Sequence, residues 1–158
     1  MHIIHPLNPI YDKNSKVLIL GTMPSVKSRE ANFYYANKTN RFWPILGKIF
    51  NIKLDATIDK EEFILKNNIA LWDVVKSCDI TGSSDASIKN VKINDIDKII
   101  KDSNIKVIFC TGKKAYETLN KYYKTNIPVY YLSSPSSANA QKSIDELVKE
   151  YKIILKYL

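Results

Sequence analysis

Short apolar runs alternate with longer segments of helical period along the chain. The runs have β-type composition and lie near polar, Gly, Pro or Ser signals; they are residues 17–20, 69–74, 107–110 and 129–132. Strands that alternate with helices form parallel sheets with helices on both faces. The pattern therefore predicts an α/β fold, a three-layer α/β/α sandwich with a central, mainly parallel four-stranded sheet.

The segments between the predicted strands carry helix signals. Polar pairs at capping-box spacing are Asp59 with Glu62, Asn94 with Asp97, and Ser143 with Glu146. The segment 112–123 carries apolar side chains on one helical face, namely Ala115, Tyr116, Leu119 and Tyr122. The last helix is expected to run from Ser143 to Leu158, because apolar residues recur there at helical spacing.

The segment 21–43 follows the first predicted strand, so it lies at a carboxyl strand end, where open α/β sheets bind ligands. Between Ser25 and Thr39 there is no sustained helical or strand period, and a connection this long in a small domain is usually functional or disordered. Its aromatic residues argue against disorder. A functional loop is therefore expected here.

Both arginines of the chain, Arg29 and Arg41, fall in this segment, whereas the other 22 of the 24 basic side chains are lysines. Arginine supplies a planar fork that lysine cannot, which favours bidentate contact with phosphate or carboxylate. The alternative is that one or both arginines pair with Glu30 or a helix end. The formal charge of +8 favours a polyanionic partner, although excess lysine also serves solubility.

The 158 residues, 45% of them hydrophobic, suffice for one core, so residues 1–158 are expected to form a single domain. No apolar run is long enough to span a membrane, and the start of the chain lacks signal-peptide features, so we expect no membrane partner and a cytoplasmic location.

Cysteine and histidine usage gives no sign of a metal or cofactor. Cys78 and Cys110 form no C-x-x-C pair, which excludes an iron–sulfur centre, and both are expected to be buried reduced thiols. The only histidines, His2 and His5, lie at the terminus and are expected to be solvated. We therefore expect no cofactor and no metal site.

Two familiar catalytic patterns are not fulfilled. Gly112 follows a predicted strand, but a P-loop needs a glycine about five residues earlier, where Val107 stands. Gly112 is instead expected to ease a strand-to-helix turn. The serine pairs at 83–84 and 136–137 lack a G-x-S-x-G context, which argues against a serine hydrolase.

A second unusual loop, residues 132–139, follows the fourth predicted strand and reads LSSPSSAN. Small hydroxylated residues with Pro135 form a stiff loop that can donate hydrogen bonds to phosphate oxygens. The alternative is an ordinary strand-to-helix turn. Its position at another carboxyl strand end favours a function shared with the first loop.

Six sequence blocks carry a family resemblance. They are GTMPS at 21–25, FYYAN at 33–37, NRFWP at 40–44, IALWDV at 69–74, DASIKN at 85–90 and SPS at 134–136. In this order they resemble the uracil-DNA glycosylase superfamily over nearly the whole chain. The specific NRFWP block is most similar to the deoxyinosine (hypoxanthine) DNA glycosylase branch.

The resemblance implies an enzyme that flips a deaminated base out of DNA and hydrolyses its N-glycosidic bond, with an uncharged amide orienting the attacking water. In other branches that polar residue lies in the first motif, where this chain has Met23. The deoxyinosine branch uses an asparagine of the N-R-F-W block, which corresponds to Asn40 and makes it the candidate catalytic residue. Asn40 is also a plausible helix N-cap before Arg41.

Further roles follow from the resemblance. Asp73 is expected to accept the N1 hydrogen of hypoxanthine, a donor that adenine lacks; a turn or cap carboxylate is its alternative. An aromatic side chain is expected to stack on the flipped base, or else to pack the loop onto the core. The candidate base-binding residues are Thr22, Met23, Phe33, Tyr34, Asp73 and Ser134. The candidate DNA contacts are Ser25, Arg29, Arg41, Ser87, Asn90, Ser136, Ser137 and Asn139.

The leading expectation is thus a monomeric DNA glycosylase whose partner is DNA containing a deaminated base. Many branches carry His or Asn where Ser134 stands, which weakens an assignment to uracil. A mismatch-type uracil-DNA glycosylase, a non-catalytic nucleic-acid-binding α/β module and a nucleoside or nucleotide hydrolase remain alternatives.

Overall fold

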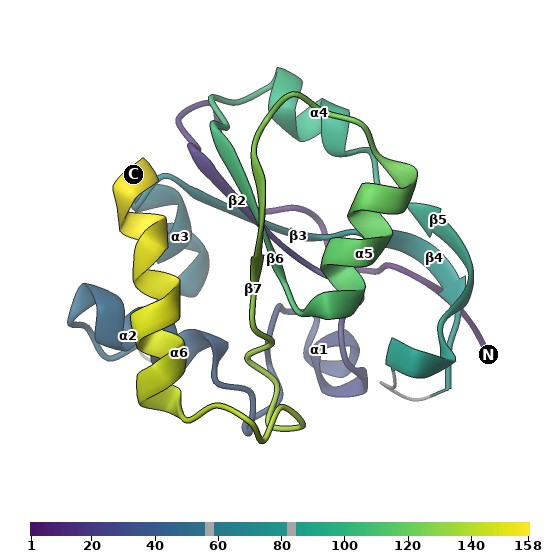
Figure 1. The fold of residues 1–158 in the computed structure, drawn as a ribbon, viewed down its shortest axis with the longest axis horizontal. Helices are drawn as coiled ribbons and strands as arrows, with labels where there is room; N and C mark the ends of the chain where they lie inside the picture. The colour runs from purple at the N-terminus through teal and green to yellow at the C-terminus, as the bar shows by residue number, and fades with distance from the viewer. Residues whose placement is uncertain (56–58, 82–84) are drawn as a thin grey trace.

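Four parallel strands form the central sheet of the computed structural model, which describes residues 1–55, 59–81 and 85–158 (Figure 1). The strand order is β3-β2-β6-β7. The strands are β2 (Val17–Gly21), β3 (Ile69–Asp73), β6 (Val107–Thr111) and β7 (Val129–Leu132). The predicted sheet and its four strands are confirmed.

Strands β2, β3 and β6 are buried on both faces because their apolar side chains alternate between two cores, whereas Tyr130 and Tyr131 of β7 are exposed. Val17 and Ile19 of β2 belong to one core, and Leu18 and Leu20 to the other. The first core also contains residues of α2 (Phe42–Phe50), α3 (Lys60–Lys66) and α6 (Ile144–Tyr151). The second contains residues of α4 (Ile96–Lys101) and α5 (Lys113–Tyr122). Figure 1 shows these two helix groups on opposite sides of the sheet, as the three-layer prediction requires.

Two of the three predicted helix starts are confirmed. Asp59 accepts a hydrogen bond from the backbone N–H of Glu62 and caps α3. Ser143 and Glu146 form the reciprocal capping box of α6, and the chain continues as a 3₁₀ helix, η2 (Lys152–Tyr157). The third start was wrong by one residue, because Asp95 caps α4.

The α5 prediction holds with one exception. Gly112 is the N-cap and has φ of +97°, in the region that favours glycine. Ala115 and Leu119 are buried as predicted, but Tyr122 is exposed.

A second sheet was not predicted. The antiparallel strands β1 (His2–Ile4), β4 (Val75–Asp79) and β5 (Lys89–Ile93) form it in the order β1-β4-β5. β4 begins two residues after β3 ends, so the chain passes directly from one sheet to the other. A short 3₁₀ turn, η1 (Asp85–Ser87), precedes β5. The serine pair 83–84 lies outside the described residues.

The first functional loop contains a helix, contrary to expectation. α1 (Val26–Ala31) starts at Ser25, whose hydroxyl accepts a hydrogen bond from the backbone N–H of Ser28. The helix has only six residues, too few to show a sustained period in the sequence. Both cysteines are buried free thiols, as predicted. None of the helices in the described part of the chain has the length and apolar character that a bilayer crossing demands.

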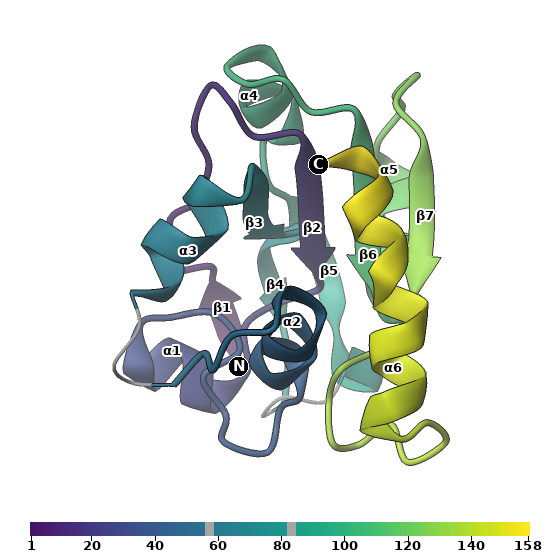
Figure 2. The ribbon, with the colours of Figure 1, turned by 90° about the vertical axis from the view of Figure 1, so that its left-hand side faces the viewer.

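The carboxyl ends of the parallel strands meet at one edge of the sheet. In Figure 2 the strand arrows point down toward α1, α2 and the loop before α6. From β2 the chain moves first to β3 on one side and then to β6 and β7 on the other, so the strand order reverses beside β2. Open α/β sheets bind ligands at such a switch point.

Candidate active site

A cavity of about 190 Å³ lies at this edge. Residues from the ends of β2, β3 and β6, from the α1–α2 connection and from the loop after β7 line it; they are Gly21, Thr22, Met23, Pro24, Ser25, Tyr34, Tyr35, Asn37, Thr39, Asn40, Asp73, Thr111, Ser134, Pro135, Ser136 and Ser137. The two loops singled out in the sequence therefore form one site.

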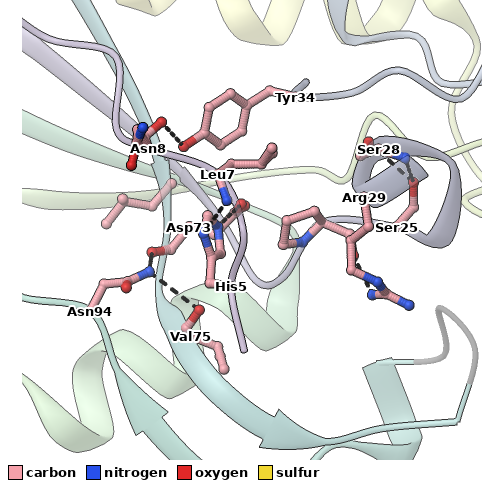
Figure 3. Close-up of polar contacts among 12 residues, drawn as sticks. His5, Leu7, Asn8, Ser25, Ser28, Arg29, Tyr34, Asp73, Val75 and Asn94 are labelled. Atoms are coloured by element: carbon pink, nitrogen blue, oxygen red, sulfur yellow. Dashed lines mark hydrogen bonds and ion pairs between the residues drawn. The ribbon is translucent and has the colours of Figure 1, made fainter. Parts of the chain in front are cut away.

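Asp73 contributes a buried carboxylate to the cavity. The ring of His5 donates from Nε2 to Asp73 Oδ2 at 2.7 Å, and the side chains are only 2% and 5% exposed, respectively (Figure 3). The expectation of a solvated His5 was wrong, because the N-terminal segment turns inward across β3 and β4. His2, in contrast, is 60% exposed and lies near Asp79.

The backbone beside Asp73 is tightly fixed. The side-chain amide of Asn94 donates to the carbonyls of Asp73 and Val75 at 2.8 and 3.2 Å, respectively, which explains why Asn94 does not cap α4 (Figure 3). Gly21 lies so close that a Cβ at this position would be 2.5 Å from Asp73 Oδ1. The Asp73 carboxylate can therefore reach its position only beside a glycine.

Tyr34 and Tyr35 form an aromatic wall of the cavity. Tyr34 is buried and its hydroxyl donates to the carbonyl of Asn8 at 2.7 Å. Tyr35 stacks on Phe42 with ring centroids 3.9 Å apart, and its hydroxyl lies 3.3 Å from Thr111 Oγ1. Burial, with the Asp73 carboxylate as the second cause, raises the pKa of both tyrosines, so both hydroxyls stay protonated.

Tyr35 also has a backbone conformation that bulky residues rarely adopt, with φ of +52°. Its ring stacking and hydroxyl contact offset this cost. Phe33, in contrast, stacks on Trp43 with centroids 5.7 Å apart and packs on the first core, outside the cavity lining. Sequence reasoning considered Phe33, Tyr34 and, as the weakest choice, Tyr35 for base stacking. The fold brings Tyr34 and Tyr35 to the cavity and leaves Phe33 in the core.

Asn40 lines the cavity. The expected N-cap role was wrong, because Arg41 is the N-cap of α2 and Asn40 precedes it. Its Oδ1 accepts a hydrogen bond from the backbone N–H of Phe42 at 2.9 Å, the contact expected of a cap or turn asparagine. Asn40 is half-buried, and its amide NH₂ has no hydrogen bond to the described residues. This contact uses only Oδ1, so the NH₂ group remains able to bind a water molecule.

Arg41 holds the second loop through its backbone carbonyls. Its Nη1 donates to the carbonyl of Lys142 at 2.6 Å. Its Nη2 donates to the carbonyls of Ser136 and Asn139, at 2.8 Å each, and Nε reaches that of Pro135 at 3.3 Å. These bonds engage most of the guanidinium donors, so the structure gives Arg41 a loop-holding role that the sequence did not indicate.

A second set of contacts fixes the start of the same loop. Glu150 accepts hydrogen bonds from the backbone N–H of Ser133 at 2.5 Å, from its hydroxyl at 2.9 Å and from Lys142 Nζ at 2.5 Å. Burial acts to raise the pKa of Glu150, but the bonds from Lys142 and Ser133 outweigh it and hold the pKa below its ordinary value. The Ser133 carbonyl accepts from the hydroxyl of Tyr151 at 2.6 Å.

The loop presents three predicted serines to the cavity. Ser134 Oγ accepts from the backbone N–H of Ser136, and Ser136 Oγ accepts from that of Ala138, each at 3.2 Å. The exposed Ser137 hydroxyl lies 3.0 Å from Thr39 Oγ1 across the cavity mouth. Asn139 lies behind them, where its side-chain amide donates to the carbonyl of Ser134 at 3.0 Å. The loop is thus more ordered than a simple turn.

The remaining predicted residues divide between the cavity and its surroundings. Thr22 and Met23 line the cavity, and so does Ser25, the N-cap of α1. Arg29 lies on α1 and donates to the carbonyl of Pro24 at 2.8 Å (Figure 3).

Ser87 and Asn90 lie apart from the cavity lining. Ser87 accepts from the backbone N–H of Thr81, and Asn90 donates to Asp79 Oδ2 at 2.6 Å. As DNA contacts these residues stay predictions.

The cavity offers a carboxylate acceptor, an amide, hydroxyl groups and an aromatic wall. Among the described residues that line it, none is a lysine or cysteine, so no amine or thiol nucleophile is present there. Sequence reasoning missed the contributions of His5 and Thr111. Of these, only Thr111 could have been identified from the sequence, because it lies at the carboxyl end of a predicted strand.

Comparisons with known proteins agree with this fold. A family model described as the uracil DNA glycosylase superfamily matches residues 9–158. A protein of Methanosarcina barkeri named hypoxanthine DNA glycosylase is 36% identical over 139 residues, which cover 83% of this chain and 85% of that protein. One of the same name from Methanosarcina acetivorans is 36% identical over 141 residues, or 85% of this chain and 87% of that protein.

A solved structure extends the comparison. The solution NMR structure of a Methanosarcina acetivorans protein, described provisionally as a uracil DNA glycosylase, matches with a TM-score of 0.77 at 28% identity. The match covers 98% of this chain and 99% of that one.

Proposed function

This chain belongs to the uracil DNA glycosylase superfamily, and we propose that it removes hypoxanthine from DNA by hydrolysing the N-glycosidic bond, which leaves an abasic site. The observation that carries the proposal is the buried Asp73 carboxylate in a cavity walled by tyrosine and closed by two ordered loops. The relatives named hypoxanthine DNA glycosylase support the choice of base.

Base recognition rests on Asp73. Hypoxanthine has an N–H donor at N1, whereas N1 of adenine is an acceptor, so a carboxylate attracts the first base and repels the second. A base can reach this buried group only after it has been flipped out of the helix, which costs about a few kcal/mol. Tyr34 and Tyr35 offer the aromatic surface that partly replaces lost stacking.

Bond cleavage needs a water molecule behind the anomeric carbon while the base departs. Its oxygen bonds to that carbon, the bond from the carbon to the base nitrogen breaks, and the base leaves with a proton. We propose that Asn40 orients the water through its NH₂ group, since Asn40 lines the cavity and an amide can orient water without acting as a strong base.

The net charge of +8 supports attraction to DNA. Ser25, Arg29, Ser136 and Ser137 lie in or beside the cavity mouth and are the first candidates for backbone contact. We further propose that residues 1–158 act as one domain and as a monomer in the cytoplasm.

An abasic-site assay tests the function. Duplexes that contain hypoxanthine, xanthine or uracil are incubated with the protein and then cleaved with alkali. Release of hypoxanthine with a strand that stays intact until alkali is added is expected, and activity should survive a chelator. Preferred release of uracil would identify the mismatch-type alternative. DNA binding without any abasic product would identify a binding module, and release of base from free deoxyinosine a nucleoside hydrolase.

The role of Asn40 is tested at the same time. Asn40→Ala should lower single-turnover base release by roughly 100-fold or more while DNA affinity stays close to wild type. It should also cost about 1 kcal/mol of stability, because the bond from the N–H of Phe42 is lost.

Asp12→Ala is the matched control. Asp12 Oδ1 accepts from the backbone N–H of Asn14 at 2.8 Å, so the variant removes the same kind of contact outside the cavity lining. Its rate should stay at the wild-type level. Equal rates for Asn40→Ala and wild type would leave Asn40 with only a structural role, as the acceptor for the N–H of Phe42.

A further inference from the structure

The hydrogen bond between His5 and Asp73 is buried beside the cavity, and it joins the N-terminal segment to the carboxyl end of β3. A histidine with a side chain only 2% exposed requires hydrogen-bond partners for both ring nitrogens. Both partners of His5 come from the protein, so two contacts fix the orientation of its ring.

The two partners determine which ring nitrogen carries the proton. The backbone N–H of Leu7 donates to His5 Nδ1 at 3.3 Å, so Nδ1 must present a lone pair (Figure 3). Nε2 then carries the hydrogen and donates it to Asp73 Oδ2. The ring acts as a neutral donor of fixed orientation.

This donor fixes the carboxylate as an acceptor. With Oδ2 engaged by His5, the second oxygen, Oδ1, is directed past Gly21, where only a hydrogen occupies the place of a Cβ. Oδ1 makes no hydrogen bond to the described residues, although Asp73 lines the cavity. It is therefore the oxygen available to a ligand.

We propose that His5 is a positioning and specificity-determining residue, which holds Asp73 as the acceptor for a base with an N–H group on its Watson–Crick edge. This inference rests on the proposed glycosylase function. Without the His5 donor, the Asp73 carboxylate can rotate away from the base. This rotation weakens the preference for hypoxanthine over a base whose N1 is an acceptor.

The experiment compares two substrates in single-turnover reactions. One duplex contains deoxyinosine, and the other contains deoxynebularine, whose purine base has an acceptor at N1 and no oxygen at C6. His5→Phe keeps a ring but removes the donor, and it should lower the ratio of the two rates roughly 10-fold. His5→Gln, whose terminal NH₂ can replace Nε2–H, should restore much of the ratio.

His2→Phe provides the matched control, because His2 lies 3.0 Å from Asp79 in an exposed pair outside the cavity lining. It should leave the ratio unchanged. If His5→Phe lowers both rates by the same factor, His5 is only structural and the inference is wrong while the glycosylase function stands. If wild type releases no base from any lesion, the proposed function fails and the inference fails with it.

A measurement on the wild-type protein does not depend on the folding of any variant. The ring nitrogens of His5 are assigned by ¹⁵N NMR at neutral pH, with the exposed His2 as the internal comparison. A neutral ring protonated at Nε2 is expected. A His5 ring protonated at Nδ1, or at both nitrogens, would overturn the inference.

Discussion

Replacing Arg41 by lysine distinguishes between two possible roles of this side chain. The sequence favours contact with a DNA phosphate, whereas the structure shows the guanidinium bound to carbonyls of the loop after β7. Lysine keeps the positive charge but presents its donors from one nitrogen, so it cannot reach carbonyls on several sides at once.

The expected loss of stability follows from the bond lengths. Three of the carbonyl bonds are 2.6–2.8 Å long, and the fourth, from Nε, is 3.3 Å. Hydrogen bonds to charged groups contribute about 1.5–3 kcal/mol each. If lysine replaces one of the three short bonds, two are lost, and the lower figure gives a cost of about 3 kcal/mol.

Urea unfolding of wild type and Arg41→Lys measures this cost, and DNA titrations over a range of salt concentrations measure the phosphate contribution. The loop-holding reading predicts lower stability and an unchanged salt dependence. Each phosphate contact contributes a slope of about −0.9 in log affinity against log salt. Wild-type stability combined with weaker DNA binding would refute the loop-holding reading.

Two further changes test other parts of the site. Gly21→Ala places a Cβ 2.5 Å from Asp73 Oδ1, so single-turnover release of hypoxanthine should fall at least about 10-fold; an unchanged rate would show that the carboxylate is not needed where it lies. Glu150→Gln should lower stability at neutral pH, because the pKa of Glu150 is depressed in the folded protein. This contribution is complete above the unfolded pKa of about 4.3 and is lost as pH falls through the folded pKa, so unfolding curves of the two proteins should converge in acid. A difference that persists in strong acid would contradict that assignment.

Local patterns in the sequence were sufficient for the central sheet. The runs that became β2, β3 and β6 are apolar at the positions that face the two cores, so the sequence alone indicates their burial. The capping box of Ser143 is equally local, since both partners lie within one turn. The position of both loops at carboxyl strand ends also identified the cavity before its geometry was known.

Tertiary structure decided which side chains act together in that cavity. His5 and Asp73 are separated by 68 positions, and a terminal histidine has the same local sequence whether it is solvated or buried. The carbonyls that Arg41 binds lie 94 to 101 positions away. Every residue has a backbone carbonyl, so the sequence does not indicate which of them an arginine will bind. Hydrophobic period records which face of an element is buried, but a hydrogen bond between distant segments exists only after the chain topology has brought them together.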